Sequence, residues 1–71
     1  MISATEQRLI ETMIDYGAKD ELIHLLCSAL STAQQENAIH LMQRHYQKHG
    51  EVTEEDMLKA LLILRKQSKK P

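Results

Sequence analysis

The sequence has no tryptophan and no phenylalanine, and it has only one cysteine, one proline and two glycines among 71 residues. A single cysteine, Cys27, cannot form a disulfide within the chain, so we expect a reducing, cytoplasmic setting. With so little glycine there is no glycine-rich loop to hold a phosphate group. The longest apolar run, Ala60 to Leu64, is far shorter than the roughly 20 residues that span a bilayer. We therefore expect no membrane association, and the first residues show no secretory signal.

The sequence also has no clear excess of acidic or basic residues. Charged residues make up 27% of the chain, but the formal net charge is only −1. A chain built to bind nucleic acid would be clearly basic, so we do not expect nucleic acid as a partner. Apolar residues make up 42% of the chain, with ten leucines, six isoleucines and four methionines, which is enough to bury a core. The sequence predicts one small domain over residues 1–71.

Strand signals are weak, because no segment alternates cleanly between polar and apolar residues. The predicted fold class is all-α: a small four-helix bundle-like domain that self-associates. The helices are expected at about 4–16, 20–30, 33–49 and 54–67, and residues 68–71 are expected to form a frayed basic tail.

The ends of these helices are predicted from capping residues and glycines. Two pairs have the three-residue spacing of a capping box, namely Ser3 with Glu6 and Thr32 with Gln35. Gly17 and Gly50 are expected to end the first and third helices, since glycine adopts the left-handed conformation without strain. The apolar residues of the second and third helices would point to opposite sides of one continuous helix, which predicts the break between them.

The fourth helix has the clearest start. Thr53 is the expected N-cap with Asp56 at N3, and Val52 and Met57 are the two halves of a hydrophobic staple. Acidic residues occupy its first turn and basic residues follow at its far end, which suits the helix dipole.

The apolar arc of this fourth helix is wider than the stripe of an ordinary surface helix. Its apolar residues form one face with Met57, Leu61 and Leu64, a second face with Leu58 and Leu62, and Ile63 beyond them. The second helix is apolar around most of its circumference and is expected at the centre of the domain. We therefore expect the first face in the core and Leu58, Leu62 and Ile63 at an interface. The alternative is that the fourth helix is itself central.

These features predict a non-enzymatic protein: a small interaction or regulatory adaptor module that homodimerises through apolar helical faces and binds another protein. No catalytic residue and no cofactor are predicted, because the hydroxyl groups and carboxylates have structural explanations at helix starts. Met13, Met42 and Met57 are expected to suit an adaptable contact surface.

Two pairs of residues have the spacing of neighbouring metal ligands on a helix, and for one of them, His24 and Cys27, filling of the core or of an interface is the default interpretation. His45 and His49 are four residues apart and share a helix face, which is half of a zinc site. A complete site needs three or four converging ligands, so no metal is predicted and the two residues are weak candidates. A metal-responsive regulator that uses these two histidines is one alternative to the adaptor function.

The segments Leu30-Ser31-Thr32, Ala38 to Met42 and Gly50 to Leu61 resemble the opening of a sigma-region-4 or LuxR-type helix-turn-helix. The resemblance implies the main alternative to the adaptor function, which is a degenerate helix-turn-helix DNA-binding transcriptional regulator. Its phosphate contacts would come from six basic residues, namely Arg44, Lys48, Arg65, Lys66, Lys69 and Lys70. The chain departs from the family where apolar helix continues in place of a turn and recognition helix.

The chain is also similar, in spacing only, to the small helical transcription-and-export adaptor of the histone deubiquitination module. The shared features are a glycine, a leucine-rich helix and Val-Thr-x-x-Asp. No residue role is carried over from it.

Overall fold

The computed structural model describes residues 2–68, which form four α-helices. They are α1 (Ala4–Asp15), α2 (Asp20–Ala29), α3 (Thr32–His49) and α4 (Glu54–Ser68). The prediction of an all-α domain of four packed helices is confirmed, and each predicted helix end lies within one residue of the observed end. Residues 69–71 of the predicted tail lie outside the described residues, whereas residue 68 ends α4.

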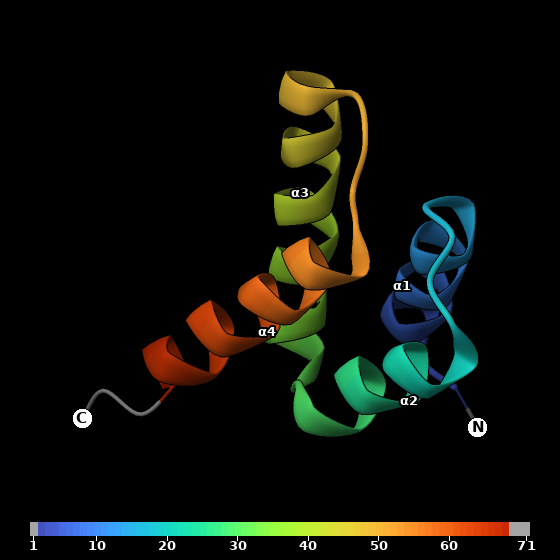
Figure 1. Cartoon of the computed structure of the whole chain (residues 1–71). Coiled ribbons are helices and arrows are strands. Elements are labelled where there is room, and N and C mark those ends of the chain that lie inside the picture. The colour runs from blue at the N-terminus through green and yellow to red at the C-terminus, as the bar shows by residue number, and fades with distance from the viewer. Residues whose placement is uncertain (1, 69–71) are drawn as a thin grey trace.

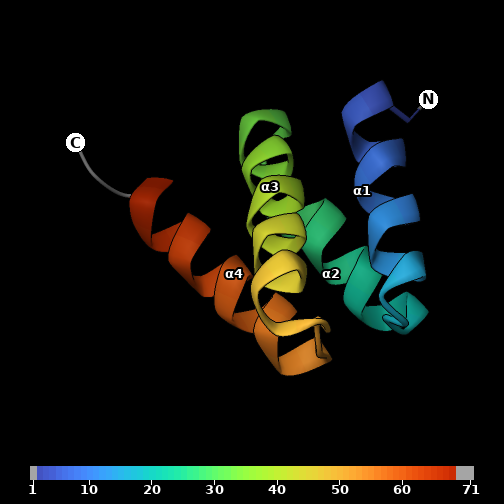
Figure 2. The same cartoon turned by 90° about the horizontal axis from the view of Figure 1, so that it is seen from above.

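The middle of the fold is occupied by α3, and not by α2 as the sequence predicted. Figures 1 and 2 show α3 with α1 on one side and α4 on the other, while α2 crosses near one end of α3. The physical reason is length: α3 has 18 residues and α2 has 10. At about 1.5 Å per residue, only α3 can extend along both neighbours. Among residues 2–68, no helix is long and apolar enough to cross a lipid bilayer.

The two glycines end helices as predicted. Gly17 has φ 85° and follows α1, where its amide donates to the carbonyl of Ile14 and the amide of Ala18 donates to the carbonyl of Met13. This hydrogen-bond pair is a Schellman motif. Gly50 has φ 79° and donates its amide to the Tyr46 carbonyl at the end of α3.

The start of α3 differs from the prediction by one residue. Ser31, and not Thr32, is the N-cap: its hydroxyl accepts from the Gln34 amide, while the Gln34 side chain accepts from the Ser31 amide. Gln35, which the sequence pairs with Thr32, is buried instead. Its Nε2 donates to the carbonyls of Cys27 at 3.1 Å and Leu30 at 3.3 Å. Gln35 therefore covers carbonyls at the end of α2 that have no partner within that helix.

The start of α4 is as predicted. The Asp56 amide donates to the Thr53 hydroxyl, and the Asp56 carboxylate accepts from the Thr53 amide. Val52 and Met57 are both buried, as expected for a hydrophobic staple. At Ser3 only one half of the predicted capping box is present. The Ser3 hydroxyl accepts from the Glu6 amide, but the Glu6 side chain does not accept from the Ser3 amide.

One core joins all four helices. Its buried members are Leu9, Met13, Leu22, Ile23, Leu26, Leu30, Ala38, Ile39, Met42, Val52, Met57, Leu61 and Leu64. The three methionines that were expected to line a contact surface are in this set, so that prediction is wrong. Their unbranched side chains fill irregular space between leucines and isoleucines, which is the other common use of methionine.

Candidate interaction surface

Two faces of α4 have opposite environments. Met57, Leu61 and Leu64 are buried, as the sequence predicted. Leu58 is 41% exposed and Leu62 is 67% exposed. Because the buried face fixes how α4 is rotated against the rest of the protein, the two leucines are held pointing away from the core.

Ile63 extends this exposed apolar surface toward α3. It is 50% exposed, and it shares a shallow hollow with Leu62, Arg65 and Lys66. On its other side Ile63 borders a groove of about 250 Å³ between α3 and α4, which Leu41 also lines. The apolar surface of α4 therefore continues from Leu58 through Leu62 to Ile63.

The same groove is lined by two residues whose contact the sequence did not predict. Nε2 of His45 lies 3.1 Å from Oδ2 of Asp56, and both residues line the groove. The Thr53 amide and hydroxyl donate to this carboxylate, and together with His45 they lower the pKa of Asp56 below its ordinary value. The pair connects α3 with the first turn of α4.

The candidate metal ligands His45 and His49 do lie side by side, with ring centroids 4.4 Å apart. His45 already contacts Asp56. Within residues 2–68, no three histidine, cysteine, aspartate or glutamate side chains are placed to hold a metal ion. The contact of His45 with Asp56 joins α3 to α4, and the pair His45 and His49 supplies half of a zinc coordination shell.

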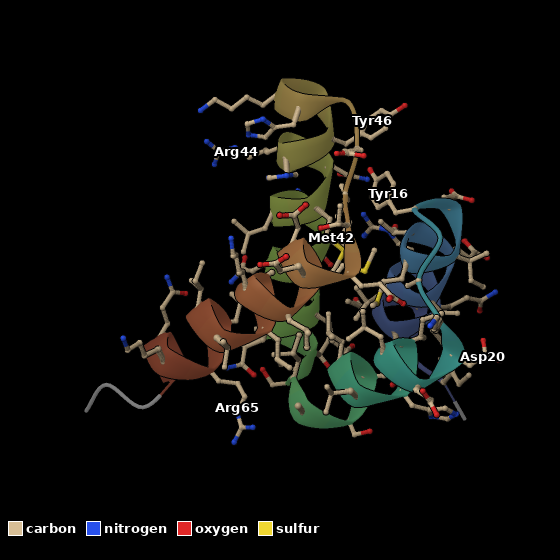
Figure 3. The ribbon with its side chains drawn as sticks, viewed as in Figure 1. Tyr16, Asp20, Met42, Arg44, Tyr46 and Arg65 are labelled. Carbon is tan, nitrogen blue, oxygen red and sulfur yellow. The ribbon has the colours of Figure 1, made fainter. Side chains whose placement is uncertain are left out.

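The basic residues of the helix-turn-helix alternative lie on different parts of the molecule. Arg44 borders a groove between α3 and α4 that also includes His40 and Ile63, whereas Arg65 and Lys66 border the hollow beside Leu62 on α4. Figure 3 shows Arg44 and Arg65 on different helices, far from each other. Lys48 is exposed near the end of α3, and Lys69 and Lys70 lie outside the described residues.

Two contacts join α1 and the residue that caps it to α3, and the sequence did not predict either of them. Tyr16 stacks on Tyr46 with ring centroids 5.3 Å apart, and Figure 3 shows the two rings between the ends of these helices. Glu36 accepts from Arg8 at 3.1 Å. The partners in each contact are about 30 residues apart in the sequence, so no local pattern could predict the contacts. The one hint of the tyrosine stack was that the chain has just two tyrosines.

Comparison of the chain with protein-family models, with curated proteins and with solved structures finds no match. The surface of α4 must therefore be interpreted from its own chemistry.

Proposed function

We propose that this protein is a small non-enzymatic interaction module that self-associates through the outer face of α4. The observation that supports this most is the exposure of Leu58 and Leu62, two leucines one helical turn apart. They lie on a helix at the edge of the molecule, where a second chain can approach (Figure 2). Exposed apolar surface of this kind is typical of a binding site.

The size of this surface sets the expected strength of association. The exposed parts of Leu58 and Leu62 together amount to about one full leucine side chain per copy. Burying a leucine side chain contributes roughly 1.5–3 kcal/mol, so a symmetric dimer gains about twice that from these residues. Association itself costs at least about 4 kcal/mol of lost freedom. We therefore expect a weak, reversible dimer.

The polar groups near this surface favour an interaction module over an enzyme. Glu54 accepts a hydrogen bond from the Lys19 amide, and Asp56 is occupied by Thr53 and His45. Asp56 therefore caps the start of α4 and Glu54 connects α4 to the start of α2, which explains both carboxylates without catalysis. In this proposal the dimer works in the cytoplasm and presents its remaining surface to another protein.

Sedimentation across the micromolar range tests the proposal. We expect the mass of the wild type to rise from monomer toward dimer as concentration increases. Leu58→Glu with Leu62→Glu should give a folded monomer, because a charge buried without a partner opposes association. The matched control is Leu25→Glu, since Leu25 on α2 is 44% exposed and should leave the dimer intact. A wild type that remains monomeric at every concentration would contradict self-association.

A further inference from the structure

Two grooves between α3 and α4 meet at Leu41 and Ile63. The first has a volume of about 250 Å³ and the second of about 240 Å³, and these two residues line both of them. Figures 1 and 2 show that α4 diverges from α3 toward its C-terminal end, so the two helices do not cover each other there. Leu41 is half-buried against the core and Ile63 is 50% exposed. Together the two grooves form one apolar surface, the α3–α4 groove.

Each part of this groove also contains a lysine or an arginine. Lys59 lines the first part and Arg44 lines the second, and both are exposed. The guanidinium group of Arg44 makes no ion pair or hydrogen bond within residues 2–68. Hydrogen bonds from Thr53 lower the pKa of Asp56 most, and the attraction of Lys59 lowers it least. Both basic side chains are therefore open to an anionic partner.

The other charged groups that face the groove already have partners. Asp56 is the one carboxylate among the described residues that line it, and this carboxylate accepts from Thr53 and contacts His45. His40 lines the second part, and its Nε2 lies 3.6 Å from a carboxylate oxygen of Glu36. The groove therefore offers positive charge beside apolar side chains.

We propose that the α3–α4 groove binds an acidic amphipathic helix of a partner protein. The apolar residues of that helix pack on Leu41 and Ile63. Its carboxylates contact Arg44 and Lys59. A helix with its apolar face in a groove is a common mode of peptide recognition, and the planar guanidinium group of Arg44 can donate two parallel hydrogen bonds to one carboxylate. The inference adds a binding face and a charge for the second protein that the proposed adaptor role requires, and it does not depend on self-association.

The shape and chemistry of the groove favour a protein segment over other anions. Arg44, Lys59 and Ile63 are all exposed, so a small molecule would not be enclosed as it is in typical ligand pockets. Nucleic acid presents a row of phosphates, which would leave the apolar surface between the two basic residues uncovered. An amphipathic helix with acidic residues beside its apolar stripe contacts both kinds of surface.

Selection from a peptide library tests the predicted charge. The probe is a library of helical peptides of about four turns, with a fixed leucine stripe and with glutamate or lysine at each flanking position. We expect selection on the wild-type protein to enrich glutamate, because like charges across an interface oppose association. Enrichment of lysine, equal recovery of both residues, or recovery of no peptide would overturn the proposal.

Charge reversal then locates the binding of a selected peptide. Arg44→Glu should weaken it roughly tenfold, because one exposed ion pair changes an equilibrium by about two- to fivefold and the reversal adds a repulsion. The control is Lys48→Glu, the same charge change at an exposed position of α3 that lines neither part of the groove. It should change the binding by less than about twofold. Equal losses in both variants would show attraction by net charge alone and would overturn the groove as the site.

The variant Leu58→Glu with Leu62→Glu separates this inference from self-association. Neither leucine lines the groove, so the variant should bind the selected peptide as the wild type does. Loss of peptide binding in this variant would place the peptide on the outer face of α4 and overturn the inference. A wild type that stays monomeric but binds the peptide through Arg44 would overturn self-association alone. Displacement of the peptide by a random DNA duplex, with DNA binding also lost in Arg44→Glu, would make the groove a nucleic-acid surface instead.

Discussion

His45 and Asp56 connect α3 to α4 through one carboxylate oxygen. Oδ2 of Asp56 lies 3.1 Å from Nε2 of His45, and it also accepts from the amide of Thr53 at 3.0 Å and its hydroxyl at 2.8 Å. The atom that caps α4 is therefore also the atom that contacts α3. Protonating this carboxylate should weaken the helix start and the contact between the helices together.

The first prediction concerns acid stability. The pKa of Asp56 is lowered mainly by the hydrogen bonds from Thr53, with a smaller contribution from His45. A carboxyl group with a lowered pKa in the folded state adds stability above its unfolded pKa, and this is lost as pH falls through the folded value. We expect the melting temperature to fall as pH decreases below about 4, the ordinary range of aspartate.

Thermal melts of Asp56→Asn across the same pH series isolate this contribution. The variant should be less stable than the wild type at neutral pH and should approach it in acid. Glu51→Gln, an exposed position outside the helices, is the control and should follow the wild type. If Asp56→Asn and the wild type lose stability in parallel below about pH 4, Asp56 is not a source of the acid sensitivity.

The second prediction concerns Gln35. Its Nε2 is the donor for the carbonyls of Cys27 and Leu30 at the end of α2, and its side chain is buried. Gln35→Ala leaves both carbonyls without this donor, which should cost about 2 kcal/mol of unfolding free energy. Urea unfolding followed by circular dichroism measures it. Gln43→Ala, at an exposed position of α3, should change stability by less than about 0.5 kcal/mol, and equal losses at both positions would show that the buried amide has no special role.

Local chemistry made much of the fold predictable. The boundaries at Gly17, Gly50 and Thr53 follow from glycine conformation and capping, both of which are set within a few residues. The two faces of α4 follow from helical periodicity once Thr53 fixes its start. The core face with Met57 and the exposed face with Leu62 were therefore both identified in advance.

The missed features depend on contacts between residues far apart in the sequence. Nothing near His45 indicates that it would meet Asp56, because that contact needs α3 to fold back against α4. The role of Gln35 was missed for a related reason: Ser31 and Thr32 are both good N-caps. The choice of Ser31 moves the capping box by one residue and turns Gln35 into the core.

The third prediction concerns metal. His45 and His49 have adjacent rings, but two histidines supply only half of a zinc coordination shell. We expect calorimetry to show weak zinc binding. Tight one-to-one binding that is lost in His49→Ala but retained in His40→Ala would contradict this, and it would favour the metal-responsive alternative.

The fourth prediction separates the helix-turn-helix alternative from the proposed interaction module. With a net charge of −1 and with Arg44 and Arg65 on different helices, we expect no sequence-specific DNA binding at physiological salt. Gel-shift titration against a randomised duplex pool, with competitor DNA, measures this. Competitor-resistant selection of one site, lost in Arg44→Ala, would make DNA binding the better hypothesis.

The fifth prediction compares two adjacent leucines of α4. Leu61 is 5% exposed and Leu62 is 67% exposed, so the same Leu→Ala change should act on different properties. Leu61→Ala removes a buried side chain and should cost about 2–5 kcal/mol of unfolding free energy, a large share of the roughly 5 kcal/mol expected for a domain this small. Leu62→Ala should leave the stability of the monomer within about 0.5 kcal/mol and weaken the dimer.

Concentration has to be controlled in this comparison, because dimerisation adds to apparent stability by mass action. Urea unfolding at high dilution reports the monomer, and sedimentation at higher concentration reports the dimer. Leu61→Ala should lower the urea midpoint strongly, while Leu62→Ala should change only the sedimentation result. If Leu62→Ala destabilises the dilute monomer as much as Leu61→Ala, then Leu62 contributes to the core, and the outer face of α4 is not a free surface for a second copy.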